Sequence, residues 1–152
     1  MAPSAYLAGL QWLARRELSE AQVRQRLVRR GYEPEAIDAA VTRLREERAL
    51  DDRRVASAIA NTETRVRGRG RLRVKRQIEA AGISSVTAQE AVEAAFAEVD
   101  SDALLAAALE RRLRGRATIA DDREFQRLFR YLAAQGFESD RVLAALRSRR
   151  AK

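Results

Sequence analysis

The stretch VRQRLVRRGYEPEAIDAAV, residues 23–41, decides the fold because the chain repeats its pattern twice more. The further copies are VKRQIEAAGISSVTAQEAV, residues 74–92, and LFRYLAAQGFESDRVLAAL, residues 128–146. Each copy holds one glycine at the same place, and these are Gly31, Gly82 and Gly136, which stand 51 and 54 residues apart. Large apolar residues recur eight and four positions before each glycine and one, six and ten positions after it, with Ala88 the one small exception. Agreement at so many positions indicates an internal repeat.

Each copy of the repeat predicts two helices joined by a tight turn. Apolar residues four positions apart form one stripe of a helix, both before and after the glycine. The glycine supplies the left-handed residue that commonly ends a helix. In the first copy, Ser19 and Gln22 form a capping-box pattern at the start of the first of these helices, and Pro34 suits the first turn of the next.

A further helix is expected upstream of each pair, over about residues 4–16, 51–67 and 102–113. Short linkers are expected at 67–70 and 115–120. The predicted fold is therefore all-α, with three tandem three-helix modules over residues 1–50, 51–99 and 100–152. A module of about 50 residues is small for a stable core, so neighbouring modules should support one another in an elongated, curved array.

The composition argues against catalysis. The 152 residues include no cysteine and no histidine, which removes disulfides, thiolate zinc sites and the commonest general base. Asp51 and Asp52, like Asp121 and Asp122, precede apolar periodicity and are better explained as helix caps than as paired catalytic or metal-binding carboxylates. Gly68 and Gly70 lack the lysine and spacing of a nucleotide-binding loop. We predict no cofactor, no metal and no enzymatic activity; a hydrolase that uses carboxylates alone is the weaker alternative.

The net charge of +8 indicates a polyanionic partner. Of the 30 basic residues 28 are arginine, which suits phosphate contacts but is also expected from a GC-rich coding sequence. The densest run of cations lies within the second module, where residues 65–76 hold seven cations and no acid: Arg65, Arg67, Arg69, Arg71, Arg73, Lys75 and Arg76. We call residues 65–76 the basic segment and predict that it binds DNA phosphates or acidic protein side chains. The alternatives are a solvated basic face, or a flexible arginine–glycine arm that binds nucleic acid weakly.

Other features of the sequence bear on location and packing. No apolar run approaches the 18 residues needed to cross a bilayer, and the first ten residues lack a signal-peptide pattern. We expect a cytoplasmic protein that is monomeric and does not contact membranes. Tyr6, Trp12, Tyr32 and Phe137 are expected to pack between helices rather than to stack on bases.

The ordered set of these residues resembles the RecX family, which regulates the bacterial recombinase RecA. The first module carries Ser19, Val23, Leu27, Gly31-Tyr32 and Leu44, followed by the stretch Leu50-Asp51-Asp52-Arg53. The second and third carry the Arg-Gly-Arg-Gly run 67–70, Gly82-Ile83, Arg130-Tyr131-Leu132 and Gly136-Phe137. This sequence departs from the family pattern at Arg48, where the family often has glycine, and at Val55, where it often has phenylalanine. Val23 also replaces a common leucine, and Ala80-Ala81 replaces a basic pair before Gly82.

The resemblance implies three tandem three-helix modules and a non-enzymatic modulator. RecX-like proteins bind recombinase filaments on single-stranded DNA, along the helical groove, and lower ATP hydrolysis, strand exchange and coprotease action in DNA repair and the SOS response. Some also bind DNA directly, including double-stranded DNA. The alternative from the basic segment alone is an autonomous DNA- or RNA-binding module without a filament partner.

Overall fold

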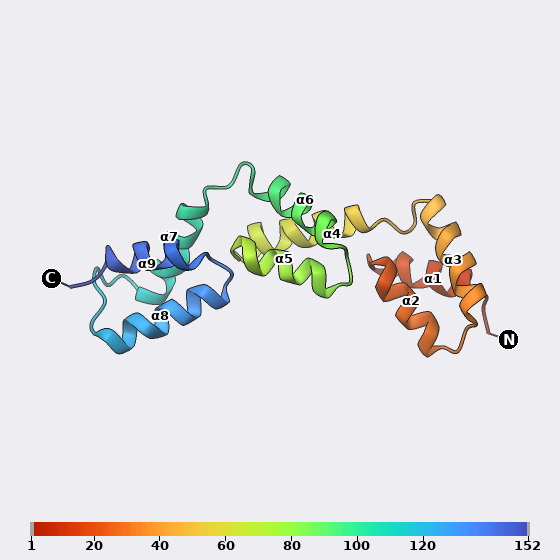
Figure 1. Cartoon of the computed structure of the whole chain (residues 1–152), viewed down its shortest axis with the longest axis horizontal. Coiled ribbons are helices and arrows are strands. Elements are labelled where there is room, and N and C mark those ends of the chain that lie inside the picture. Colours follow the sequence, from red (N-terminus) through yellow and green to blue (C-terminus); the bar gives the residue numbers. More distant parts are fainter. Residues whose placement is uncertain (1, 152) are drawn as a thin grey trace.

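The computed structural model describes residues 2–151, which form an elongated, slightly arched row of helices (Figure 1). The helices are α1 (Ala5–Arg15), α2 (Glu20–Arg29), α3 (Pro34–Glu46), α4 (Asp52–Asn61), α5 (Arg71–Ala80), α6 (Ser85–Phe96), α7 (Ser101–Leu113), α8 (Asp122–Ala134) and α9 (Ser139–Arg147). Within residues 2–151 the only β-type contact is an isolated bridge between Ile119 and Arg150. The fold is all-α, as predicted. Among the described residues, no helix has the length and apolarity to span a bilayer.

The buried side chains form three clusters, one for each set of three helices. The first cluster lies within α1–α3 and the following turn, the second within α4–α6, and the third within α7–α9 and the loop before α8. Every pair of helices in extensive contact belongs to a single set. The three tandem three-helix modules are thus present as predicted. Met1 and Lys152, the outermost residues of the predicted first and third modules, lie outside the described residues.

The repeated glycines end the second helix of each module as predicted. Gly31, Gly82 and Gly136 have φ angles of +84°, +82° and +102°. Ser19 caps α2 and forms the predicted capping box with Gln22. The apolar residue that follows each glycine packs against the core of its module. Tyr32 does so half-buried, whereas Ile83 and Phe137 are buried.

The second helices of the three modules, α2, α5 and α8, follow one another head to tail along the lower side of Figure 1. The C-terminal end of α8 meets the N-terminal end of α5, where the Gly70 N–H donates to Gln135 O at 2.9 Å. The C-terminal end of α5 meets the N-terminal end of α2, where the Ser19 hydroxyl donates to Ala81 O. We call this series of helices the α2–α5–α8 row.

Two backbone features in the first half of the chain depart from ordinary helix and turn geometry. The helix predicted over 51–67 changes from α-helix to a π-helical turn at Thr62–Val66, in which Glu63 and Thr64 are buried. Arg48, in the turn between α3 and α4, has a φ of +58°. The RecX resemblance places glycine at that position, and the left-handed backbone explains why glycine suits it.

Candidate partner-binding surface

The basic segment begins in the π-helical turn, crosses the loop at Gly68–Gly70 and continues into the first half of α5. Gly70 caps α5 without a side-chain hydrogen bond, and the first turn of α5 contains no acid. Arg71 and Arg73 therefore lie at the positive end of the helix dipole, where cations are unfavourable. The segment has an electrostatic cost that an anionic partner would relieve.

Acidic side chains just outside the basic segment neutralise part of it. Glu63, which is 7% exposed, lies 3.4 Å from Arg67 and 3.9 Å from Arg69. On α5, Glu79 lies 3.8 Å from Lys75. Sequence counting from residue 65 to 76 missed both acids, although Glu63 stands two residues before the segment and Glu79 three residues after it.

Two further members of the segment join the second module to the third. The Arg69 guanidinium donates to the side-chain amide oxygen of Gln135 on the turn after α8. Arg73 Nη1 donates to Ala134 O at 3.3 Å, and the Leu72 N–H donates to Gly136 O at 3.0 Å. A Cβ on Gly70 would lie 2.5 Å from Gly136 C, so the close approach requires glycine. This part of the segment is a junction between modules as well as a charged surface.

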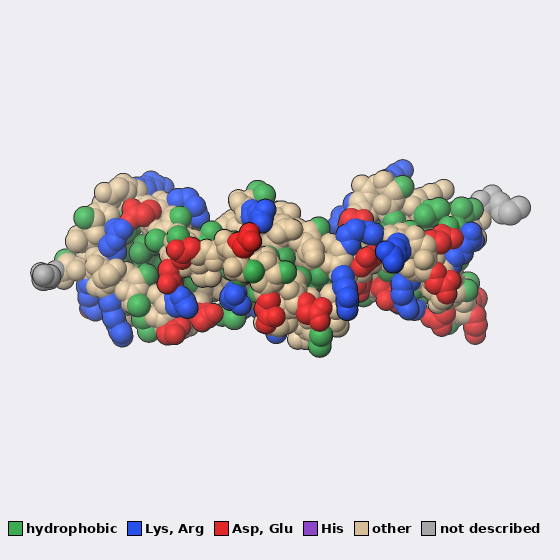
Figure 2. All heavy atoms as spheres, turned by 90° about the horizontal axis from the view of Figure 1, so that it is seen from above, with side chains coloured by type: hydrophobic (Ala, Val, Ile, Leu, Met, Phe, Trp, Pro, Cys, Tyr) green, Lys and Arg blue, Asp and Glu red, His purple; other side chains and the backbone are tan. Residues whose placement is uncertain are grey.

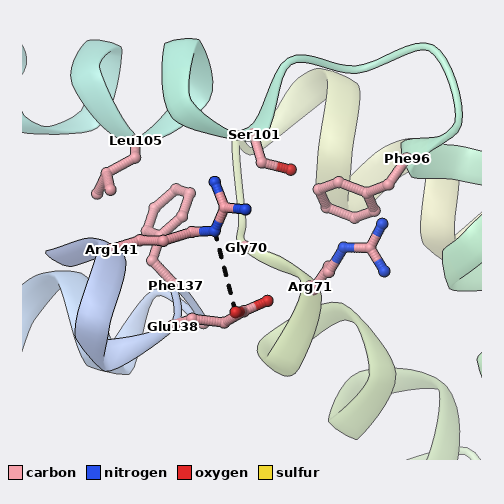
Figure 3. A pocket seen from close by; sticks show the side chains of 9 residues that line it. Gly70, Arg71, Phe96, Ser101, Leu105, Phe137, Glu138 and Arg141 are labelled. Carbon is pink, nitrogen blue, oxygen red and sulfur yellow. Dashed lines mark ion pairs between the residues drawn. The ribbon is translucent and has the colours of Figure 1, made fainter.

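Figure 3 shows the other side of this junction, where Arg71 extends beneath the ring of Phe96 at the end of α6. Its guanidinium carbon lies 5.2 Å from the ring centroid, which is a cation–π contact. Beside it, Glu138 and Arg141 form an ion pair 4.0 Å long. The cavity between them measures about 20 Å³, enough for a water molecule and too small for an organic ligand.

The seven predicted site residues therefore divide into three groups. Arg67, Arg69 and Lys75 are ion-paired, Arg71 and Arg73 are half-exposed with contacts to Phe96 and Ala134, and Arg65 and Arg76 are exposed. Arg73 and Arg76 also line a hollow of about 330 Å³, together with Gln77, Ala80 and Ala134 of α8. The part of the basic segment most available to a partner is the α5 face that opens into this hollow.

Two other arginine clusters lie in the outer modules, outside the basic segment. In the first module, Arg26 and Arg30 lie 5.6 and 5.5 Å from the centroid of the Trp12 ring. In the third, Arg112 lies 3.6 Å from the centroid of Tyr131. A shared position relative to the repeat glycine links the two clusters in the sequence, because Arg26 and Tyr131 each stand five residues before a glycine.

The four aromatic residues singled out from sequence pack as expected. Tyr6, Trp12 and Tyr32 lie half-buried against the first cluster, and Phe137 is buried in the third. Trp12 nevertheless keeps one side toward a hollow of about 240 Å³ that Arg26, Arg29 and Arg30 also line.

The acidic residues serve as caps and ion-pair partners. Asp51 accepts from the Arg53 N–H at 3.0 Å, and Asp121 accepts from the Glu124 N–H at 2.9 Å, so both are helix caps as predicted. A hydrogen bond from Arg116 lowers the pKa of Glu124 below its usual value. Among residues 2–151, no three acidic side chains gather closely enough to hold a metal ion.

Similarity to known proteins agrees with this architecture. The family model for the first three-helix domain of RecX matches residues 5–44. "Regulatory protein RecX" of Halorhodospira halophila is 36% identical over 138 residues, which cover 91% of this chain and 83% of that protein. The protein of the same name from Xanthomonas axonopodis pv. citri is 35% identical over 136 residues, 89% of this chain and 81% of its own.

Solved structures show the same fold at lower identity. The crystal structure of RecX from Lactobacillus salivarius superposes with a TM-score of 0.75 and 18% identity, over 94% of this chain and 92% of the other. A second crystal structure, of a regulatory protein RecX, superposes with a TM-score of 0.72 and 21% identity, over 94% of this chain and 70% of the other. The sequence similarity over most of both chains, together with the shared fold, shows that this chain belongs to the RecX family.

Proposed function

We propose that the protein is a regulator without catalytic activity that binds a RecA-type recombinase filament on single-stranded DNA. Bound there, it lowers the filament's ATPase, strand-exchange and coprotease activities, and so acts in homologous recombination, DNA repair and the SOS response. It does this in the cytoplasm as a monomer. Family membership over nine-tenths of the chain is the observation that carries the proposal.

The shape and charge of the chain support this function. A row of three modules offers a long surface to a partner that is itself elongated. The basic segment lies at the middle of that row, with cations at the N-terminal end of α5 that no acid of the first turn offsets. We propose that its exposed members, Arg65 and Arg76, and its half-exposed members, Arg71 and Arg73, contact DNA phosphates or acidic recombinase side chains.

The structure favours Arg65 and Arg76 as the first residues to change, because both are exposed and neither forms an ion pair within residues 2–151. The double variant Arg65→Ala/Arg76→Ala should fold normally. A matched control is Arg53→Ala/Arg147→Ala, which removes two exposed arginines from α4 and α9. The triple variant Arg71→Ala/Arg73→Ala/Arg76→Ala removes the whole α5 face, although it also removes the Phe96 and Ala134 contacts.

The deciding experiment is retention of the protein by a DNA-bound recombinase filament, compared with the same DNA naked, and inhibition of the filament's ATPase. The wild type and the control should be retained by the filament and should inhibit. The basic-segment variants should inhibit only at about tenfold higher concentration, since two or three charge contacts are lost. Equal retention on naked DNA, without inhibition, would instead support an autonomous DNA- or RNA-binding module.

A further inference from the structure

The arginines of the second helices keep a common position relative to the repeat glycine. Arg73 and Arg76 stand nine and six residues before Gly82, and Arg127 and Arg130 stand nine and six residues before Gly136. In α2, the corresponding pair is moved one helical turn toward the glycine: Arg26 and Arg29 stand five and two residues before Gly31. Residues three or four apart share one face of a helix, so all three pairs lie on the same side of their modules.

All six arginines are available to a ligand. Arg29, Arg76, Arg127 and Arg130 are exposed, while Arg26 and Arg73 are half-exposed. Within residues 2–151, none of the six forms an ion pair, whereas Arg24, Arg43 and Arg45 of the first module are all paired. The core does not require these side chains, because the apolar stripe lies at the positions eight and four residues before each glycine.

Each pair of arginines opens into a hollow, so the α2–α5–α8 row carries one hollow per module. The hollows measure about 240, 330 and 440 Å³ from the first module to the third. Among all their lining residues the single acid is Glu124, which Arg116 already binds at 2.9 Å. On the face shown in Figure 2, basic and acidic side chains are instead interspersed along the molecule.

An aromatic ring lies in the hollow at each end of the row. Trp12 lines the hollow of the first module, and Tyr131 lines that of the third. Both rings already stack with arginine, at 5.6 Å for Arg26 and 3.6 Å for Arg112. Arginines that follow a backbone, combined with aromatic rings that accept bases, are the features with which proteins bind single strands without reading their sequence.

We infer that these six arginines form one continuous track that binds the phosphate backbone of a single-stranded nucleic acid along the α2–α5–α8 row. The inference rests on the proposed function in taking DNA as a partner. It adds a site in the first and third modules that the basic segment does not contain. The helices have 10, 10 and 13 residues, so end to end they span about 50 Å at ~1.5 Å per residue. At about 3.4 Å per stacked nucleotide this is room for roughly 15 nucleotides.

The chain contains a reporter at one end of the track, because Trp12 is its single tryptophan. Its fluorescence should change when oligothymidylates bind to the full-length protein in the absence of recombinase. Affinity should rise with oligonucleotide length up to about 15 nucleotides and change little beyond it. A duplex of the same length should bind more weakly and leave the fluorescence nearly unchanged, since its bases are not free to stack.

The variant Arg127→Ala/Arg130→Ala tests whether the three modules bind one strand. These arginines lie in the third module, so they cannot affect Trp12 directly. A strand of about 15 nucleotides should bind the variant about tenfold more weakly, with a salt slope lower by ~1.4 for two lost phosphate contacts. A strand of about 5 nucleotides, which reaches only one module, should be unaffected. The variants Arg127→Lys/Arg130→Lys and Arg53→Ala/Arg147→Ala should behave as wild type.

Several outcomes would overturn the track. These are affinity independent of oligonucleotide length, unchanged affinity of the Arg127→Ala/Arg130→Ala variant, or equal binding of duplex with the same fluorescence change. Retention by recombinase filaments is measured separately. A protein that is retained by filaments and inhibits them without any response of Trp12 to DNA would refute the track and leave the proposed function intact.

Discussion

At each of the two junctions between modules, the C-terminal end of one second helix meets the N-terminal end of another, but different groups make the contact. Where the third module meets the second, backbone approaches backbone at Gly70 and Gly136, and two backbone hydrogen bonds cross the junction. Where the second meets the first, side chains make the contact: the Ser19 hydroxyl donates to Ala81 O, and Asp52 accepts from the Glu20 N–H at 2.9 Å.

The comparison shows what the repeat glycine does beyond ending a helix. A Cβ at Gly82 would overlap the side chain of Ala21, and one at Gly136 would overlap the backbone of Arg73. At Gly31, in the first of the three modules, a Cβ would meet nothing within 4 Å. The repeat glycine therefore ends a helix in all three modules, and in the second and third it also allows close contact with the neighbouring module.

Gly136→Ala should have the largest effect, because it combines left-handed strain with overlap at the junction. We expect a loss of about 3–5 kcal/mol in the free energy of unfolding, measured by urea denaturation. Gly31→Ala introduces the same left-handed strain without the overlap and should cost about 1–2 kcal/mol. Equal losses would show that the close approach at the third module contributes nothing to stability.

Ser19→Ala should rank second. It removes both the cap of α2 and the hydrogen bond to Ala81 O across the first junction, so we expect a loss of about 2 kcal/mol. Ser84→Ala is the matched control, because Ser84 caps α6 and its side-chain hydrogen bonds within residues 2–151 stay in its own module. The control should cost about 1 kcal/mol, and urea denaturation measures both losses. Equal losses of stability in the two variants would show that the hydrogen bond from Ser19 to Ala81 O does not stabilise the junction.

Glu63→Gln tests the charged contact at the junction between the second and third modules. Glu63 is buried beside Arg69, which reaches Gln135 in the third module. We expect a loss of about 1–2 kcal/mol, because Arg69 then lies half-buried without its counter-charge. Glu79→Gln, which removes only the ion pair with Lys75, should change stability by less than about 0.5 kcal/mol. Chemical denaturation of both variants measures the two changes in the free energy of unfolding.

Arg48→Gly should have the smallest effect and the opposite sign. Relief of the left-handed backbone strain should outweigh the added entropy of the unfolded chain, for a net gain of about 0.5 kcal/mol. Arg114, with a φ of +52°, offers a second test in the third module, and Arg114→Gly should behave alike. A lower melting temperature for both variants would contradict the strain argument.

The sequence was sufficient to predict the helices and turns that depend on local pattern. The positions of Val23, Leu27 and Gly31, and of the equivalent residues in the other two copies, show where a helix lies and where it ends. Both signals depend only on residues that are close together in the sequence. The linkers expected at 67–70 and 115–120 lie between helices in the structure. The domain boundaries after residues 50 and 99 stay a prediction, since Leu104 packs against both the second and the third cluster.

The partners of the basic segment could not be predicted in this way. Arg69 and Gln135 are 66 residues apart, and apolar periodicity contains no information on which polar groups meet between modules. The π-helical turn was also missed, because its two buried residues, Glu63 and Thr64, are polar and broke the apolar pattern. The basic segment stays a prediction as a binding site. The arginine track is a proposal that needed the structure as well as the sequence, because the hollows beside the second helices are not encoded in local spacing.

The small extent of the contacts between modules has a mechanical consequence. Within each module the three helices pack along their lengths, whereas neighbouring modules touch over only a few residues. We therefore expect the molecule to bend mainly at the two junctions between modules. Small rotations there would change the curvature of the whole row while disturbing few packed side chains, Leu104 between the second and third clusters being one of them, and would let the row follow the helical path of the filament proposed as its partner.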